Sequence, residues 1–246
     1  DIGCAKVDKA RQYIHTHNSE ISIDTFPVFL HQKNVNAILK DYDIIVDCTD
    51  NFLCRYILSD ACVLLQKPFV HGAIFQYEGL VTVLNCTEEK FNYRDIYPTC
   101  PNQDSISNCN DVGAYAITTN IIGLMQANEI IRWVTNFSPL KGDTLLYYNA
   151  RNNLTYTIAM QKNKSVQYTM PTSLTELEAY PYEQFCGTIV CTLDEIDAKQ
   201  FDDFLQFSSV QIIDVRNEDE LPRINSANSM CIPMSKLHME VGRLNP

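Results

Sequence analysis

The stretch IIVDCTDNFLCRY, residues 44–56, places four polar side chains directly after an apolar run. Asp47 and Asp50 are three residues apart, and Asn51 and Arg55 follow them closely. Carboxylates suit a Mg²⁺ ion, which prefers oxygen ligands, and a guanidinium suits the phosphate that such an ion carries. The spacing therefore predicts a site for a metal-bound phosphate. The alternative interpretation is that Asp50 or Asn51 only caps the helix that follows.

Two further side chains are candidates for chemistry. Cys109, in SISNCNDVGAY, directly precedes the longest expected helix, and a helix amino terminus lowers the pKa of a thiol, which favours the nucleophilic thiolate. The neighbouring Asp111 acts in the opposite direction, so position alone favours an inert loop cysteine. Lys6 lies at the start of the first expected helix and taken by itself is a solvated lysine.

The composition limits the classes of protein to which the chain can belong. It has 246 residues, 46% of them hydrophobic, so it can bury a substantial core. A formal net charge of −11 argues against a general nucleic-acid-binding protein, which needs a basic face for phosphates. No apolar run approaches the roughly 18 residues of a membrane span. Ten cysteines in a core-rich chain without any CxxC pair indicate a reducing, cytoplasmic setting and no zinc ribbon.

The elements that must position these side chains alternate at first between helix and strand. The apolar run before Asp47 is typical of a strand that is buried on both faces of a sheet. The periodicity predicts helices over 6–18, 34–42, 51–66 and 111–136 and strands over 20–26, 44–46, 68–74, 79–86 and two within 143–160. Because antiparallel pairs follow the alternating elements, the sequence predicts an α/β fold with a sheet of mixed direction.

The chain is predicted to contain two folded parts. The first covers residues 1–160, and residues 161–198 are predicted to be a linker because they are polar and lack sustained periodicity. A second, smaller domain over 199–246 contains the strand VQIIDVR. The amino end begins in mid-pattern, which suggests that the chain is cut from a longer protein.

Several blocks together resemble the MoeB/ThiF family of E1-like adenylyltransferases. In order, they are GCAKVDKAR, DIIVDCTDNFLCRYILSDACVLLQKPFVHGAIFQYEGLVTV, SNCNDVG and GLMQANEIIRW, spanning about residues 3–160. The blocks YEQFCG and IIDVRNEDELPRINSANSMCIPMSKL resemble the linker and the first half of a rhodanese domain. The resemblance implies a Rossmann-like mixed sheet that lacks the family's first βα units, followed by the start of a rhodanese-like α/β domain.

Members of this family use ATP to activate the C-terminal glycine of a ubiquitin-like sulfur carrier, of the MoaD or ThiS type. The resemblance implies that Asp50 handles Mg²⁺ and is essential for adenylation. Asp47, Asn51 and Arg55 would surround it, with Arg55 catalytic and the other two on the nucleotide. Lys6 matches the family lysine that contacts the ATP phosphates.

The resemblance also implies a sulfur-transfer step. Cys109 matches the cysteine that forms a thioester or persulfide link, and sulfur replaces AMP to give a thiocarboxylate. The implied partners are the carrier protein, a cysteine desulfurase as sulfur donor and a second copy of the chain in a homodimer. No nucleic acid or membrane is expected, and the molybdopterin, thiamine and tRNA-thiolation pathways all stay open.

Three departures from the family pattern matter. No GxG occurs among the eight glycines, so the family's phosphate loop is absent from this sequence and the fragment is expected to bind ATP poorly. Many relatives bind zinc through two CxxC pairs, but Asn92 and Asp95 occupy the first pair's positions and MQKNKSVQY has no cysteine, so no zinc is expected. Cys231 lies before the loop that would carry a rhodanese cysteine.

Two other functions remain as alternatives. A non-catalytic scaffold could bind a ubiquitin-like partner without activating it, although the presence of Lys6, Asp50 and Cys109 favours catalysis. A nicotinamide-dependent oxidoreductase on a similar sheet is disfavoured because the glycine fingerprint of such enzymes is absent.

Overall fold

The structure, a computed structural model, describes residues 3–101, 113–138, 140–163, 165–166, 169–187, 196–205, 210–217, 219–224, 226, 228–240 and 242. The chain divides into two compact units, Asp1–Val190 and Cys191–Pro246. The residues predicted to bind a metal-bound phosphate all belong to the first unit.

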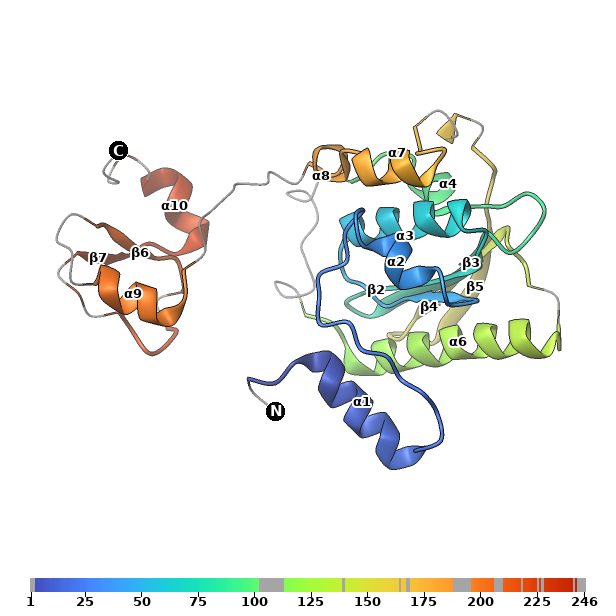
Figure 1. Ribbon diagram of the computed structural model, residues 1–246, viewed down its shortest axis with the longest axis horizontal. Coiled ribbons are helices and arrows are strands. Elements are labelled where there is room, and N and C mark those ends of the chain that lie inside the picture. The colour runs from blue at the N-terminus through green and yellow to red at the C-terminus, as the bar shows by residue number, and fades with distance from the viewer. Residues whose placement is uncertain are drawn as a thin grey trace. The chain divides into compact units, whose positions relative to one another are not determined.

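A five-stranded mixed sheet forms the centre of the first unit (Figure 1). In order across the sheet, the strands are β1 (Ile45–Asp47), β2 (Phe69–Phe75), β3 (Glu78–Leu84), β4 (Thr144–Asn149) and β5 (Leu154–Ala159). β1 and β2 are parallel, and every other neighbouring pair is antiparallel. The predicted α/β fold with a mixed sheet is thereby confirmed.

Helices cover both faces of this sheet (Figure 1). α6 (Ala116–Thr135) packs across β2 and β3 on one face. α3 (Phe52–Leu64) follows β1 on the other face, where α2 (Val35–Leu39) and α4 (Tyr93–Ile96) pack against it. α1 (Lys6–His17) contains no buried residue. In the part of the chain that the structure describes, no helix combines the length and apolar character needed to span a membrane.

The main hydrophobic core lies around α3. Apolar side chains of α3 such as Tyr56 and Ile57 are fully buried, because they pack between the sheet and the covering helices. A smaller core under α6 joins Val81, Ile122 and Tyr148. The turn after β1 leads directly into α3, the helix at the centre of the main core.

Residues 169–187 pack against α3 within the first unit, although their sequence predicts a linker. They form α7 (Leu174–Ala179) and α8 (Tyr182–Phe185), and both helices contact α3. Leu177, Tyr182 and Cys186 are buried in the main core. Their spacing of five and then four residues runs across two short helices and a turn, so it produces no sustained periodicity in the sequence.

The predicted strand over residues 20–26 is wrong, because this stretch has no strand structure. A strand needs a neighbour for its backbone hydrogen bonds. Within the described part of the sheet, β1 pairs only with β2, so residues 20–26 have no strand beside them.

The second unit contains a small parallel sheet. Its described elements are α9 (Ala198–Phe204), β6 (Ile212–Asp214), β7 (Ser229–Cys231) and α10 (Met234–Glu240). Arg216 donates two hydrogen bonds to the carboxylate of Asp214, at 2.9 and 2.7 Å, which fixes the turn after β6.

Candidate active site

The turn after β1 is held by the last side chain of the strand. Asp47 Oδ1 accepts hydrogen bonds from the backbone nitrogen of Thr49 at 2.9 Å and from its hydroxyl at 2.7 Å. Asp47 is fully buried, whereas Asp50, three residues later, is exposed. Asp47 therefore fixes the conformation of the turn from its buried side. Asp50 presents its carboxylate to solvent at the carboxyl end of β1, which is where open α/β sheets bind ligands.

The other oxygen of Asp47 contacts a histidine that the sequence analysis did not assign to the site. His71 Nδ1 lies 2.6 Å from Asp47 Oδ2, because the parallel register places the two residues opposite each other on β1 and β2. Burial raises the pKa of Asp47, but the hydrogen bonds from His71 and Thr49 outweigh it and hold that pKa below its usual value. Burial lowers the pKa of His71. At neutral pH an ionised Asp47 therefore accepts a hydrogen bond from a neutral imidazole.

Acidification should destabilise the first unit through this pair. Because the pKa of His71 is lowered in the folded chain, the unfolded chain takes up the proton first, near pH 6.5. The contribution is present above that pH and is lost as the pH falls below it, so the free energy of unfolding should be smaller at pH 5 than at pH 7. Urea unfolding followed by the fluorescence of Trp133 in α6 measures this loss. A His71→Asn variant with the same pH dependence would contradict the assignment.

Two side chains from flanking helices hold the backbone of the turn. Arg55 of α3 donates from Nη2 to the carbonyl oxygen of Thr49 at 2.8 Å, and its Nε lies 3.9 Å from Asp47 Oδ2. Gln126 of α6 donates to the carbonyl oxygen of Asp47 at 2.8 Å. A Cβ at Gly72 would lie 2.4 Å from Gln126 Cδ, so only glycine leaves room for this contact.

The helix cap at this site is Asn51 and not Asp50. Asn51 Oδ1 accepts a hydrogen bond from the backbone nitrogen of Cys54 at 2.9 Å, at the start of α3. The Asp50 carboxylate accepts no hydrogen bond from another described residue. An exposed carboxylate of this kind fits Mg²⁺, which usually keeps water and phosphate oxygens as its other ligands. The described residues contain no cluster of three or more acidic, histidine or cysteine side chains that could hold a metal alone.

Of the remaining predicted site residues, the structure describes Lys6, which forms no hydrogen bond or ion pair with Asp50. Lys6 is exposed in the first turn of α1 and forms no ion pair with another described residue. Cys109 lies outside the described residues.

The residues at the family's zinc positions do not fit a zinc ion. The Asn92 side chain accepts a hydrogen bond from the backbone nitrogen of Arg94, and the Asp95 carboxylate accepts one from the backbone nitrogen of Asn92. Both side chains thus serve as a capping box for α4. Zinc in structural sites is bound by four thiolate or imidazole ligands, and neither is present here.

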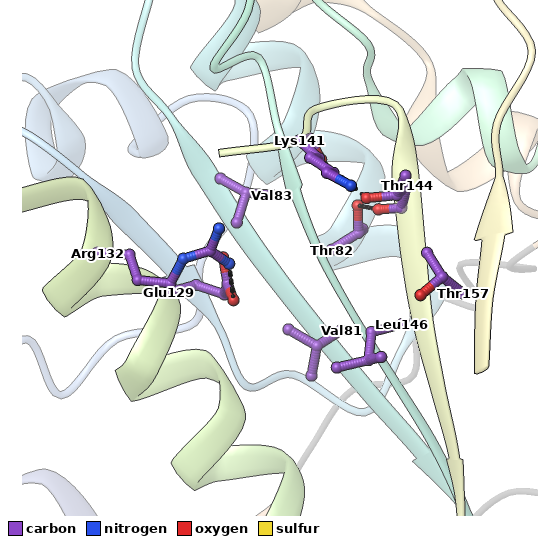
Figure 2. A pocket seen from close by; sticks show the side chains of 9 residues that line it. All are labelled: Val81, Thr82, Val83, Glu129, Arg132, Lys141, Thr144, Leu146 and Thr157. Atoms are coloured by element: carbon purple, nitrogen blue, oxygen red, sulfur yellow. Dashed lines mark hydrogen bonds and ion pairs between the residues drawn. The ribbon is translucent and has the colours of Figure 1, made fainter. Parts of the chain in front are cut away.

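A separate cavity of about 280 Å³ lies between α6 and strands β3 to β5 (Figure 2). Figure 2 shows Arg132 and Glu129 on the α6 side, and Lys141 beside Thr82 and Thr144 on the opposite side. Arg132 and Glu129 form an ion pair of 2.7 Å. No residue of the turn at 47–51 lines this cavity. The exposed turn with Asp50 is therefore a different site.

A family model matches the part of the chain that contains this turn. The model of the ThiF family matches residues 1–169, which include the whole turn after β1 and the sheet. The chain belongs to the ThiF family. This confirms the resemblance that the DIIVDCTDN block indicated, and it places Asp50 within the part that ThiF-family proteins share.

Curated relatives of this ThiF-family chain carry two kinds of name. "Adenylyltransferase and sulfurtransferase MOCS3" of Anopheles gambiae is 36% identical over 186 residues, covering 76% of this chain and 42% of the relative. The Drosophila yakuba protein of that name is 29% identical over 245 residues, covering 96% and 54%. "Probable molybdopterin-synthase adenylyltransferase" of Pyropia yezoensis is 32% identical over 241 residues, covering 96% and 61%. The chain thus spans about half the length of the curated relatives it matches.

Solved structures share the fold of this ThiF-family chain. A crystal structure of E. coli MccB with ATP superposes with a TM-score of 0.55 at 13% identity, covering 67% of this chain and 50% of that one. A second, described as SeMet PaaA, gives 0.51 at 12% identity, covering 66% and 50%. At such identities the likeness concerns the fold alone.

Proposed function

We propose that the protein containing this chain adenylylates the C-terminal glycine of a ubiquitin-like sulfur carrier, with ATP as the second substrate. The observation that supports this most is the exposed Asp50 on a turn fixed by Asp47, His71 and Arg55, in a chain of the ThiF family. The names of the curated relatives, which include adenylyltransferase, agree with the proposal.

The proposed reaction is an attack on a phosphate by an anion. A carboxylate oxygen of the carrier's terminal glycine forms a bond to the α-phosphorus, and the bond to the bridging oxygen breaks, releasing pyrophosphate. Since both reactants are anionic, positioning and charge neutralisation carry most of the rate. A bound Mg²⁺ would supply positive charge at the departing phosphates.

Within this proposal, each site residue has a separate role. Asp50 binds the metal–phosphate group, and Asn51, whose side-chain oxygen already caps α3, has its amide hydrogens left for the nucleotide. Asp47 and Arg55 act from behind the turn as positioning residues, since Asp47 is fully buried and Arg55 nearly so. Lys6 contacts the phosphates once α1 is placed over them.

We further propose that sulfur enters in a second step. A sulfur nucleophile, on Cys109 or on a rhodanese-type cysteine of the whole protein, attacks the acyl-adenylate carbonyl; a carbon–sulfur bond forms and AMP leaves. The alignment of the Drosophila yakuba relative, named adenylyltransferase and sulfurtransferase, extends through the second unit and supports a rhodanese-like assignment for it. We also propose that a cysteine desulfurase donates the sulfur, that the protein forms a homodimer and that it is cytoplasmic.

Carrier-dependent ATP–pyrophosphate exchange tests the proposed function. Radiolabelled pyrophosphate should enter ATP only when the protein containing this chain and a carrier ending in glycine are both present. A non-catalytic scaffold would bind the carrier, measured by calorimetry, but would give no exchange. Binding without exchange would therefore replace the proposal by that alternative.

A further inference from the structure

From the hydrogen bonds of α4 we infer that, within the first unit, a metal-free latch centred on Asp95 fastens Lys162 and Asn163, which precede α7 and α8, to α4. Asp95 Oδ2 accepts from the Asn92 backbone nitrogen at 2.8 Å and from Lys162 Nζ at 2.8 Å. Asp95 Oδ1 accepts from the backbone nitrogen of Asn163 at 2.9 Å. Two chain segments nearly seventy residues apart thus converge on one carboxylate.

The Asp95 carboxylate is buried and accepts three hydrogen bonds. The Asp95 side chain has 0% exposure, and that of Lys162 has 35%. Lys162 also donates to the carbonyl oxygen of Lys90 at 2.8 Å, and its ammonium group lies 5.3 Å from the ring centre of Phe91. Hydrogen bonds to an ionised, buried group are stronger than neutral ones, so this cluster can fasten two segments.

The same cluster leaves no place for a bridging metal. Zn²⁺ at Asp95 would have to displace three donors, two of which are backbone nitrogens fixed by α4 and by the turn at Asn163. Asn163 itself is engaged, because its Oδ1 accepts hydrogen bonds from the backbone and hydroxyl of Ser165 at 3.1 and 2.6 Å. No cysteine occurs between residues 110 and 185.

The latch matters because it precedes the segment that closes the main core. After Ser165 the chain leads to α7 and α8, whose Leu177 and Tyr182 are fully buried beside α3. Fastening the chain at Asn163 shortens the free segment before these helices, which lowers the entropy cost of docking them. The latch should therefore raise the stability of α7 and α8 against local opening.

Metal content, chelation and a Lys162→Met variant test the latch in the untagged chain. After expression with added zinc, we expect well below 0.1 zinc per chain and the same Tm with and without EDTA. Lys162→Met should lower Tm by roughly 2–5 °C, since one charge-assisted hydrogen bond and an ion pair are lost. It should also speed hydrogen exchange in peptides covering 160–187 but not in those covering α6.

Lys33→Met is the matched control, because Lys33 is exposed and its ammonium group forms no hydrogen bond or ion pair with a described residue. It should leave Tm and exchange unchanged, and Lys162→Arg should restore most of the wild-type protection. Stoichiometric zinc, a Tm that falls on chelation, or a Lys162→Met variant that melts and exchanges like the Lys33 control would each overturn the latch.

Discussion

Replacing Asp50 by alanine should lower carrier-dependent pyrophosphate exchange by at least about 100-fold, the loss typical when one group that stabilises developing charge is removed. The fold should remain intact, since Asp50 is exposed and accepts no hydrogen bond from another described residue. The unfolding midpoint of Asp50→Ala should therefore match that of the wild type. Asp50→Asn, which keeps the size but not the charge, should lose nearly as much exchange.

The control for this experiment is Asp41→Ala. Asp41 is an exposed carboxylate six residues before Asp47, and its side chain forms no hydrogen bond or ion pair with a described residue. It should retain wild-type exchange. Asp47→Asn should differ from both variants, because it should lower stability together with exchange. An Asp50→Ala protein that exchanges pyrophosphate at the wild-type rate would remove Asp50 from the site.

The exposed half of this site could be predicted from the sequence. The apolar run before Asp47 and the polar residues after it predict a strand end with a carboxylate, and β1 ends at Asp47, one residue after the predicted strand 44–46. The predicted hairpins over 68–86 and 143–160 are confirmed, because alternation and turn residues are local signals. Helix boundaries differ by a few residues, as at α6, which begins at Ala116 rather than 111.

The buried half of the site could not be predicted from local patterns. His71 faces Asp47 only because IVD and FVH pair in register as parallel strands, and that register is a property of the whole sheet. A comparison of the paired segments IVD and FVH could have identified His71 as the partner of Asp47. Gln126 reaches the carbonyl of Asp47 from a helix 79 residues away, through space that Gly72 leaves open.

The same reasoning explains the stretch predicted to be a linker. Its anchor residues bond to partners in α3 and α4, and no period in the segment itself reveals them. Tyr182 donates to Asp60 at 2.7 Å, and Arg94 binds the same carboxylate through Nε at 3.0 Å and Nη2 at 2.7 Å. A buried aspartate such as Asp60 needs a buried cation as its partner, but local sequence patterns do not show that this cation is Arg94.

Arg94→Met should therefore destabilise the first unit strongly. Arg94 and Asp60 are both fully buried, and the guanidinium lies 4.6 Å from the ring centre of Phe185 and 5.2 Å from that of Tyr56. Removing the cation leaves Asp60 buried without a counter-charge, which costs about 3–5 kcal/mol. Urea unfolding followed by Trp133 fluorescence measures the loss, as a lower midpoint at unchanged slope.

A double variant separates the uncompensated charge from lost packing. Asp60→Asn with Arg94→Met removes the buried charge and keeps an oxygen that can accept the hydrogen bond of Tyr182. If the uncompensated carboxylate causes most of the loss, the double variant should be at least about 1 kcal/mol more stable than Arg94→Met alone. If the double variant is less stable instead, the aromatic contacts of Arg94 dominate, and the ion pair is not what holds α4 and α8 against α3.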